Sequence, residues 1–260
     1  MNLEKAKDLM KREDLDYLLL NTYRHVFYAS GFQCFDKLIS NETEVYFIIP
    51  KERLPTYLIA PHANRFIILD FPTTAEKIIW YGSFYVKDGW IGERVDNVED
   101  ALRKAIKELN LEKSKIGIEA DSLPVLHYEK IKKLFPNATL IDASPLLQEL
   151  RIIKNDEEIE RLKKACEITE KAIKATMESV EVGMTELELE NIFRREVAKT
   201  QAHTFYVQIG SGGRGAYGGG TYPTTKKIER NEVIRMDVSV EYKGYLSDIC
   251  RNFVLGKASN

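Results

Sequence analysis

The sequence predicts an α/β fold, or α+β when its two dissimilar halves are taken together. In residues 1–145, short apolar segments typical of buried strands alternate with segments whose apolar residues recur at helical spacing. Two long helical patterns follow, and after them come strands with apolar–polar alternation around a tight turn. These observations predict two domains, residues 1–145 and 146–260.

The first half opens with a helical pattern and continues with strand-like segments that prolines separate. Leu3, Ala6 and Met10 lie at helical spacing and predict a first helix. Strands are expected at residues 17–20, 45–49, 57–60, 66–69, 115–119 and 139–141, and helices at residues 98–109 and 124–134. Strands separated by helices in this way imply an α/β layer structure.

The second half has a different order of elements. Asn155 or Asp156 can cap a long helix that ends at Gly183. A capping box at residues 185–188 starts a second helix. The remaining expected elements are a strand at residues 204–209, a glycine-rich loop, and two strands around Lys243-Gly244.

Composition excludes several classes of function. The 260 residues carry 38 Lys and Arg against 40 Asp and Glu, a formal net charge of −2, so no strong field favours nucleic acid or an anionic membrane as a partner. The charged N-terminus lacks the apolar segment of a signal peptide, and no apolar run approaches the ~20 residues of a membrane helix. The three cysteines form no C-x-x-C pair, which argues against disulfides and a thiolate zinc site and favours the cytoplasm.

Residues 210–220 form a glycine-rich loop with the sequence GSGGRGAYGGG. Gly210, Gly212 and Gly215 match the spacing of the dinucleotide fingerprint, but the following AYGGGTYP cannot open the helix that the fingerprint requires. Nucleotide binding is therefore the weakest functional hypothesis. The loop is either a flexible connection or a loop that faces a substrate.

The strongest chemical signal is a pair of aspartates, Asp237 and Asp248, in a predicted hairpin. Apolar and polar side chains alternate in residues 234–242, and Lys243-Gly244 can form a two-residue turn. The pairing that this turn imposes places Asp237 opposite Cys250, two residues from Asp248. Both carboxylates then lie on one polar face as a diagonal pair, roughly 7–8 Å apart at the backbone.

Two carboxylates that converge on one face repel each other unless a positive charge lies between them. A divalent cation would supply that charge, because carboxylate oxygens suit hard and borderline ions. The alternative is a solvent-exposed hairpin face on which Arg235 and Arg251 balance the charge. The spacing alone leaves both interpretations open, and two carboxylates are too few for a tight metal site.

Several motifs occur in order along both halves. They are Y-A-S-G-F at residues 28–32, K-I-G-I-E at 115–119, R-I-I-K with a following Glu-Glu-Ile at 151–159, G-M-T-E at 183–186, K-I-E at 227–229 and the two-aspartate hairpin at 237–251. Together they resemble the pita-bread metallopeptidases, which include prolidase, aminopeptidase P, methionine aminopeptidase and the non-peptidase creatinase. The resemblance implies a creatinase-type N-terminal α/β domain followed by an incomplete pita-bread domain.

The resemblance also implies a dinuclear metal site built from two Asp, one His and two Glu. Asp237 would bind one divalent ion and Asp248 would bridge both, and the ions (Mn, Co, Zn or Fe) would activate a water for attack on the peptide carbonyl. The family's His and two Glu would fall after residue 260, so only two of the five ligands are expected in this chain.

A substrate loop is expected around His203, Gly219, Gly220 and Tyr222. Of the four histidines, His203 alone is assigned a possible role, and the other three are interpreted as structural or surface residues. The Pro-His pair that usually precedes the hairpin in this family falls at Gly219-Gly220. This departure puts proline specificity in doubt.

Two functional hypotheses follow. The first is a segment of a hydrolase of the Xaa-Pro dipeptidase or aminopeptidase type that acts on small peptides as a homodimer. The second is a catalytically inactive protein of the same fold that serves as a dimerising binding module. In both cases we expect the 260 residues alone to bind divalent metal weakly and not to hydrolyse Xaa-Pro dipeptides.

Overall fold

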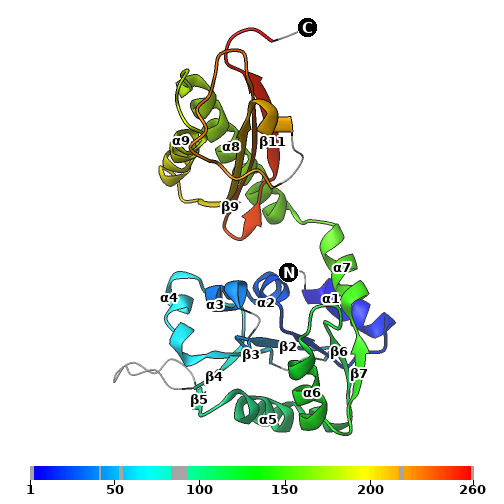
Figure 1. Ribbon diagram of the computed structural model, residues 1–260. Coiled ribbons are helices and arrows are strands. Elements are labelled where there is room, and N and C mark those ends of the chain that lie inside the picture. The colour runs from blue at the N-terminus through cyan, green and yellow to red at the C-terminus, as the bar shows by residue number, and fades with distance from the viewer. Residues whose placement is uncertain (1–2, 41, 53–54, 83–92, 217–219, 259–260) are drawn as a thin grey trace. The chain divides into compact units, whose positions relative to one another are not determined.

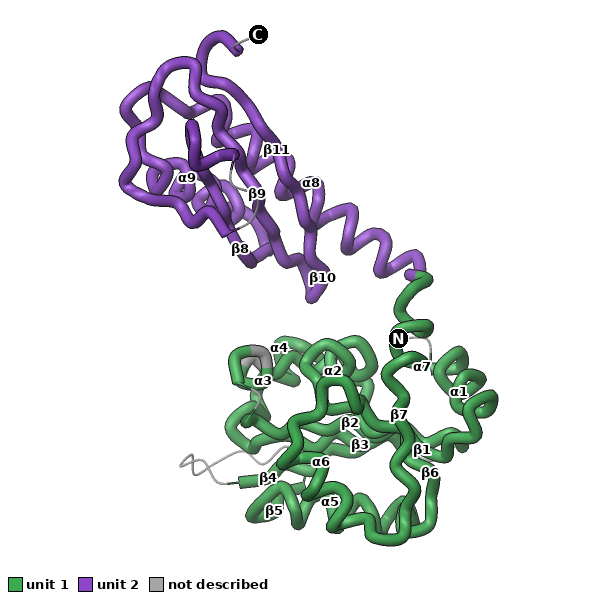
Figure 2. Tube along the Cα trace, turned by 45° about the vertical axis from the view of Figure 1, so that its right-hand side comes forward, with its two compact units in different colours: residues 1–153 green, residues 154–260 purple. Residues whose placement is uncertain are grey.

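A computed structural model describes residues 3–40, 42–52, 55–82, 93–216 and 220–258. The chain divides into two compact units, Met1–Ile153 and Lys154–Asn260 (Figure 2). The division follows helix α7 (Ser144–Ile152), whose residues Leu146, Leu147 and Leu150 are buried in the core of unit 1. Within the described ranges, no helix is both long enough and apolar enough to cross a membrane.

Unit 1 is built on a seven-stranded sheet with the order β5-β4-β3-β2-β1-β6-β7 (Figure 1). Strand β2 runs antiparallel to β1 and β3, and the other neighbouring strands are parallel. The strands are β1 (Tyr17–Leu20), β2 (Tyr46–Pro50), β3 (Tyr57–Pro61), β4 (Lys77–Tyr81), β5 (Glu93–Val95), β6 (Lys115–Ile118) and β7 (Thr139–Asp142). The predicted α/β class is confirmed.

Helices cover both faces of this sheet (Figure 1). Met10, Val26 and Leu147 belong to one buried cluster, so their helices lie on one face. Leu102 and Ile131 belong to the cluster on the opposite face. The helices are α1 (Leu3–Arg12), α2 (Tyr23–Ser30) and α7 on the first face, α5 (Val98–Leu109) and α6 (Val125–Leu134) on the second, and the short connecting helices α3 (Phe35–Ile39) and α4 (Ile67–Asp70).

The segment at residues 66–69, expected as a strand, is largely helix α4, so that prediction was wrong. A short apolar run cannot by itself distinguish a strand from a helix. Strands β3 and β4 are parallel neighbours, and parallel neighbours need a crossover connection between them. The segment belongs to this connection, where Leu69 is 65 % exposed, and not to the sheet.

Unit 2 packs two helices against one face of an antiparallel sheet (Figure 1). Helix α8 (Asp156–Ser179) starts at Asn155 and α9 (Glu186–Ala198) starts at Thr185, each with a complete capping box. Both predicted helix starts are therefore confirmed. The strands are β8 (His203–Ser211), β9 (Val233–Tyr242), β10 (Tyr245–Leu246) and β11 (Ile249–Val254), with β9 between β8 and the β10–β11 side.

The sheet of unit 2 has one apolar and one polar face, because successive side chains of a strand point to opposite sides. Met236, Val238 and Val240 of β9 are buried in a cluster with residues of α8 and α9. Arg235 and Asp237 alternate with these residues and lie on the opposite, polar face.

Candidate metal centre

The hairpin of unit 2 brings the two aspartates together. Lys243 and Gly244 have φ values of 49° and 81°, the left-handed pair that a two-residue hairpin turn requires. Strands β10 and β11 pair with β9 in the register that this turn imposes, with Asp237 opposite Cys250. The predicted register is confirmed.

Ser247 anchors the chain directly before Asp248. Its carbonyl accepts a hydrogen bond from the Ser239 hydroxyl at 2.5 Å, and its own hydroxyl accepts one from the Val240 N–H at 2.9 Å. The Ser247 hydroxyl also lies 2.6 Å from Thr169 Oγ1 on α8. Asp248 therefore extends from a fixed, buried point of the backbone.

Tyr206 of β8 joins the two carboxylates. Its hydroxyl lies 2.7 Å from Asp248 Oδ1 and 3.2 Å from Asp237 Oδ1. A phenol has a single hydrogen to donate, so two carboxylates share one donor. Burial raises the pKa of Tyr206, and the hydrogen bond to Asp248 and the charge of Asp237 raise it further. The side chain is therefore a neutral donor at neutral pH.

Arg235 supplies the positive charge next to this pair. Its Nη2 atom donates to Asp237 Oδ2 at 2.5 Å. The structure thus agrees with the charge-balancing role considered for Arg235. Arg251 instead donates to the Cys250 carbonyl at 2.9 Å and lies 3.4 Å from Glu170 on α8, so it does not balance the aspartates.

The donor set fits a divalent cation. Two carboxylate oxygens converge within hydrogen-bond reach of one hydroxyl, and such oxygens are ligands for hard and borderline metal ions. Asp237 and Asp248 are the residues that would hold it. Among the described residues, no group of three or more His, Cys, Asp and Glu side chains is arranged to bind a metal.

Glu186, the last residue of the G-M-T-E motif, ties down the segment that includes the glycine-rich loop. Its fully buried carboxylate accepts hydrogen bonds from the N–H and hydroxyl of Ser211 at 2.8 and 3.0 Å, and from the same groups of Thr224 at 3.0 and 2.8 Å. Arg214 Nε pairs with it at 3.2 Å. One buried charge therefore fixes both ends of the segment from 211 to 224.

Gly210 has to be a glycine for this loop to pack. A Cβ atom there would lie 2.7 Å from Thr221 Cγ2, closer than side-chain carbons approach other atoms, and 3.0 Å from the Arg214 carbonyl oxygen, which is tighter than most such contacts. The glycine of β8 thus permits the returning chain to lie directly against the strand.

The expected substrate-loop residues differ in their placement relative to the aspartates. Gly220 donates its N–H to Gln208 Oε1 at 3.2 Å, and Gln208 pairs with Asp237 across the sheet. Tyr222 is 73 % exposed. His203 pairs with Glu241, four residues from Asp237 along β9 and therefore about 13 Å away at ~3.3 Å per residue. Gly219 lies outside the described residues.

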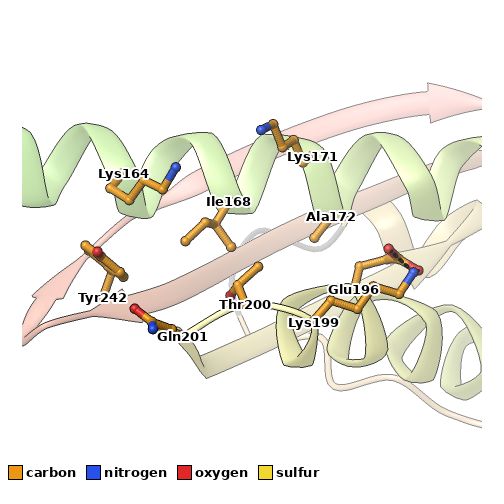
Figure 3. A pocket seen from close by; sticks show the side chains of 9 residues that line it. All are labelled: Lys164, Ile168, Lys171, Ala172, Glu196, Lys199, Thr200, Gln201 and Tyr242. Atoms are coloured by element: carbon orange, nitrogen blue, oxygen red, sulfur yellow. Dashed lines mark hydrogen bonds and ion pairs between the residues drawn. The ribbon is translucent and has the colours of Figure 1, made fainter.

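A cavity of about 390 Å³ lies on the other face of the sheet, between α8 and the end of α9 (Figure 3). Tyr242, on the apolar side of β9, is part of its wall, so this cavity does not adjoin the carboxylate pair. The Glu196 and Lys199 side chains form an ion pair at 2.7 Å at its edge (Figure 3). Its lining residues are Lys164, Ile168, Lys171, Ala172, Glu196, Lys199, Thr200, Gln201 and Tyr242.

Comparisons with known proteins define the class of this chain. Residues 2–153 match the creatinase/prolidase N-terminal domain, and residues 160–260 match metallopeptidase family M24. Together with the fold, these matches define a metallopeptidase-type chain that carries a creatinase-type first domain. The chain belongs to the creatinase/prolidase family. Metallopeptidases of family M24 use divalent metals.

Two Xaa-Pro dipeptidases are among its relatives. The one from Lactobacillus helveticus is 25 % identical over 269 residues, which covers 100 % of this chain and 67 % of the relative. The one from Pyrococcus horikoshii is 34 % identical over 145 residues, covering 54 % of this chain and 40 % of the relative.

Solved structures of prolidases and Xaa-Pro dipeptidases are also similar to this chain. The prolidase from Pyrococcus horikoshii superposes with a TM-score of 0.77 at 26 % identity, covering 99 % of this chain and 65 % of that one. The Xaa-Pro dipeptidase from Bacillus anthracis superposes with a TM-score of 0.76 at 25 % identity, with the same coverage. The chain thus spans about two thirds of the length of these relatives.

Proposed function

We propose that this chain carries part of the active site of a two-metal hydrolase of the Xaa-Pro dipeptidase type. The observation that supports the proposal is the convergence of Asp237 and Asp248 on the Tyr206 hydroxyl, on the polar face of a sheet. Family membership and the names of the relatives agree with it. In this role Asp237 and Asp248 would hold the divalent metal ions.

Different residues would have different roles in such a site. A divalent ion held by the carboxylates would act as a Lewis acid on a water and on the scissile carbonyl. Tyr206 orients Asp248 through its hydrogen bond at 2.7 Å, since partners of this kind fix the position of metal ligands. Glu186 holds the loop that carries Gly220 and Tyr222, which we propose as substrate-facing residues together with Gly219 and His203.

The family resemblance supports the finer parts of the proposal. These are Mn, Co, Zn or Fe as the metals, two per site in the complete fold, a small peptide as substrate and a homodimer as the assembly. The cytoplasm as the location is instead supported by the three cysteines, which form no C-x-x-C pair. A catalytically inactive, dimerising form of the same fold is the competing outcome.

A metal titration tests the ligand assignment. We expect the chain to bind Mn²⁺ weakly in isothermal titration calorimetry, because two carboxylates supply few ligands. Asp237→Asn and Asp248→Asn should each weaken binding at least tenfold. Glu170→Gln removes a carboxylate from the exposed surface of α8 and should leave binding unchanged. Equal binding by all four proteins would contradict the assignment.

A chimera tests the reaction. The part of the Pyrococcus horikoshii prolidase that this chain does not cover is fused after residue 260, and hydrolysis of an Xaa-Pro dipeptide is measured with Mn²⁺ or Co²⁺. We expect turnover that Asp248→Asn abolishes and Glu170→Gln preserves, whereas the 260 residues alone show none. A folded, metal-loaded chimera without turnover would favour the inactive form.

A further inference from the structure

Both oxygens of the Asp237 carboxylate already have partners. The Tyr206 hydroxyl lies 3.2 Å from Oδ1, and Arg235 donates to Oδ2 at 2.5 Å. Asp248 is engaged through Oδ1 by the same hydroxyl at 2.7 Å. The two aspartates are therefore held differently, because a full positive charge contacts Asp237.

The Arg235–Asp237 ion pair is less exposed to water than an ordinary surface ion pair. Both side chains are 19 % exposed, so water screens their attraction only in part. The residues are two positions apart on β9 and thus lie on the same face of the sheet without distortion of the strand. A metal that binds Asp237 therefore has to compete with a pre-formed partner.

We propose that Arg235 is a resident counter-ion that competes with the divalent metal for Asp237 and thereby sets the metal affinity of the site. The inference rests on the proposed function, because it takes Asp237 and Asp248 as the ligands. The three charged side chains carry a net charge of −1 with Arg235 (1 − 2) and −2 without it. A divalent ion must either displace the guanidinium from Oδ2 or bind beside a like charge, and both weaken binding.

Such competition raises the concentration at which every divalent metal occupies the site. The cost of displacing Arg235 is similar for every divalent ion, so it lowers the affinity for each of them by a similar factor and leaves their order unchanged. In the usual order of affinities for nitrogen and oxygen ligands, Co²⁺ and Zn²⁺ bind more tightly than Mn²⁺. We therefore expect Co²⁺ to enter the site at a lower concentration than Mn²⁺ both with and without Arg235, and Arg235 to raise both concentrations by a similar factor.

Charge-changing variants test the proposal through metal affinity alone. In titration calorimetry, Arg235→Gln should raise the affinity for Mn²⁺ and Co²⁺ at least tenfold, whereas Arg235→Lys, which keeps the charge, should change it less than threefold. Arg251→Gln is the matched control, because it removes one positive charge from the adjacent strand without contact to the aspartates. Thermal unfolding of each metal-free variant checks the fold, and Arg235→Met replaces Arg235→Gln if that variant does not fold.

A measurement on the unaltered chain is independent of these variants. Saturation with diamagnetic Zn²⁺ should move the side-chain N–H resonance of Arg235 in an NMR spectrum, because the guanidinium loses its partner. One set of results would overturn this inference and leave the proposed function intact. In it, the wild-type chain binds metal and Asp248→Asn abolishes that binding, but Arg235→Gln does not raise the metal affinity and the Arg235 resonance does not move. Absence of binding in wild type and in the Arg235 variants would overturn both.

Discussion

Glu119 carries a charge in the interior of unit 1, where burial alone would disfavour it. It directly follows β6 and is 1 % exposed. Its Oε2 accepts hydrogen bonds from the N–H groups of Asn21 and Thr22 at 2.5 and 2.9 Å, and its Oε1 contacts the Thr22 hydroxyl and the His25 ring. Burial raises the pKa of Glu119, but these hydrogen bonds and the charge of His25 outweigh burial and hold the pKa below its usual 4.5.

The Glu119→Gln variant should therefore destabilise unit 1 by about 2 kcal/mol at pH 7, because hydrogen bonds to a charged acceptor are lost. A depressed folded-state pKa gives stability that is fully present above the unfolded value near 4.5 and is lost as the pH falls through the folded value. Urea unfolding followed by circular dichroism should thus show that the difference in the free energy of unfolding between wild type and variant becomes smaller from pH 7 to pH 3. A difference that stays constant with pH would contradict this account. Glu129→Gln, on the exposed side of α6, is the control variant.

The sequence predicts some site residues better than others, for a geometric reason. Asp237 and Asp248 belong to one hairpin, so alternation and a two-residue turn are sufficient to place them on one face. Tyr206 approaches them from β8, which is distant in sequence and contains a register shift between Thr204 and Tyr206. A bulge reverses the expected alternation of side chains, so its position could not be derived without the pairing of β8 with β9.

At the scale of elements, hydrogen bonds link the start of helix α9 to the glycine-rich segment. The helix starts with a capping box at Thr185, and the next residue, Glu186, reaches the ends of the segment from 211 to 224. Arg214 adds a second link, since it pairs with Glu186 and also donates to the Tyr222 carbonyl at 2.8 Å. The positions of Ser211, Arg214 and Thr224 therefore depend on the start of a helix.

Replacement of Glu186 by Gln should loosen this loop. A glutamine retains one acceptor oxygen but places an NH₂ group next to the N–H and hydroxyl donors, so we expect the free energy of unfolding to fall by about 2 kcal/mol. Hydrogen–deuterium exchange of residues 211–224 should become faster in Glu186→Gln. It should be unchanged in Glu190→Gln, which alters a carboxylate of the same helix that pairs with Arg194. Equal exchange in both variants would show that Glu186 does not hold the loop.

Element prediction from the sequence succeeded where the end signals are local and strong. The starts of α8 and α9 follow from capping boxes. Helices α2 and α7 were not expected, although Thr22 and Gly31 cap α2 and a proline stands in the first turn of α7. These helices have 8 and 9 residues, too few turns for an apolar period to be distinguished from a chance pattern.

At the scale of the whole molecule, the buried residues form separate cores. Two clusters lie on the two faces of the sheet in unit 1, and a third lies between the helices and the sheet of unit 2. No residue in the described ranges belongs to clusters of both units. Each unit thus meets the main requirement for folding by itself, a core of its own.

Truncation at two positions tests this organisation and the place of the domain boundary. We propose that the first domain ends at residue 153, because Leu146, Leu147 and Leu150 of α7 are at most 4 % exposed in the core of unit 1. A fragment of residues 1–153 should unfold cooperatively with a midpoint within ~4 °C of the corresponding transition in the whole chain, a difference of about 1 kcal/mol. A fragment that ends at residue 145 loses all three leucines, each worth roughly 2 kcal/mol, and should melt far lower or not fold. Circular dichroism melts of the two fragments distinguish the boundaries, since equal stability would place the end of the domain at 145.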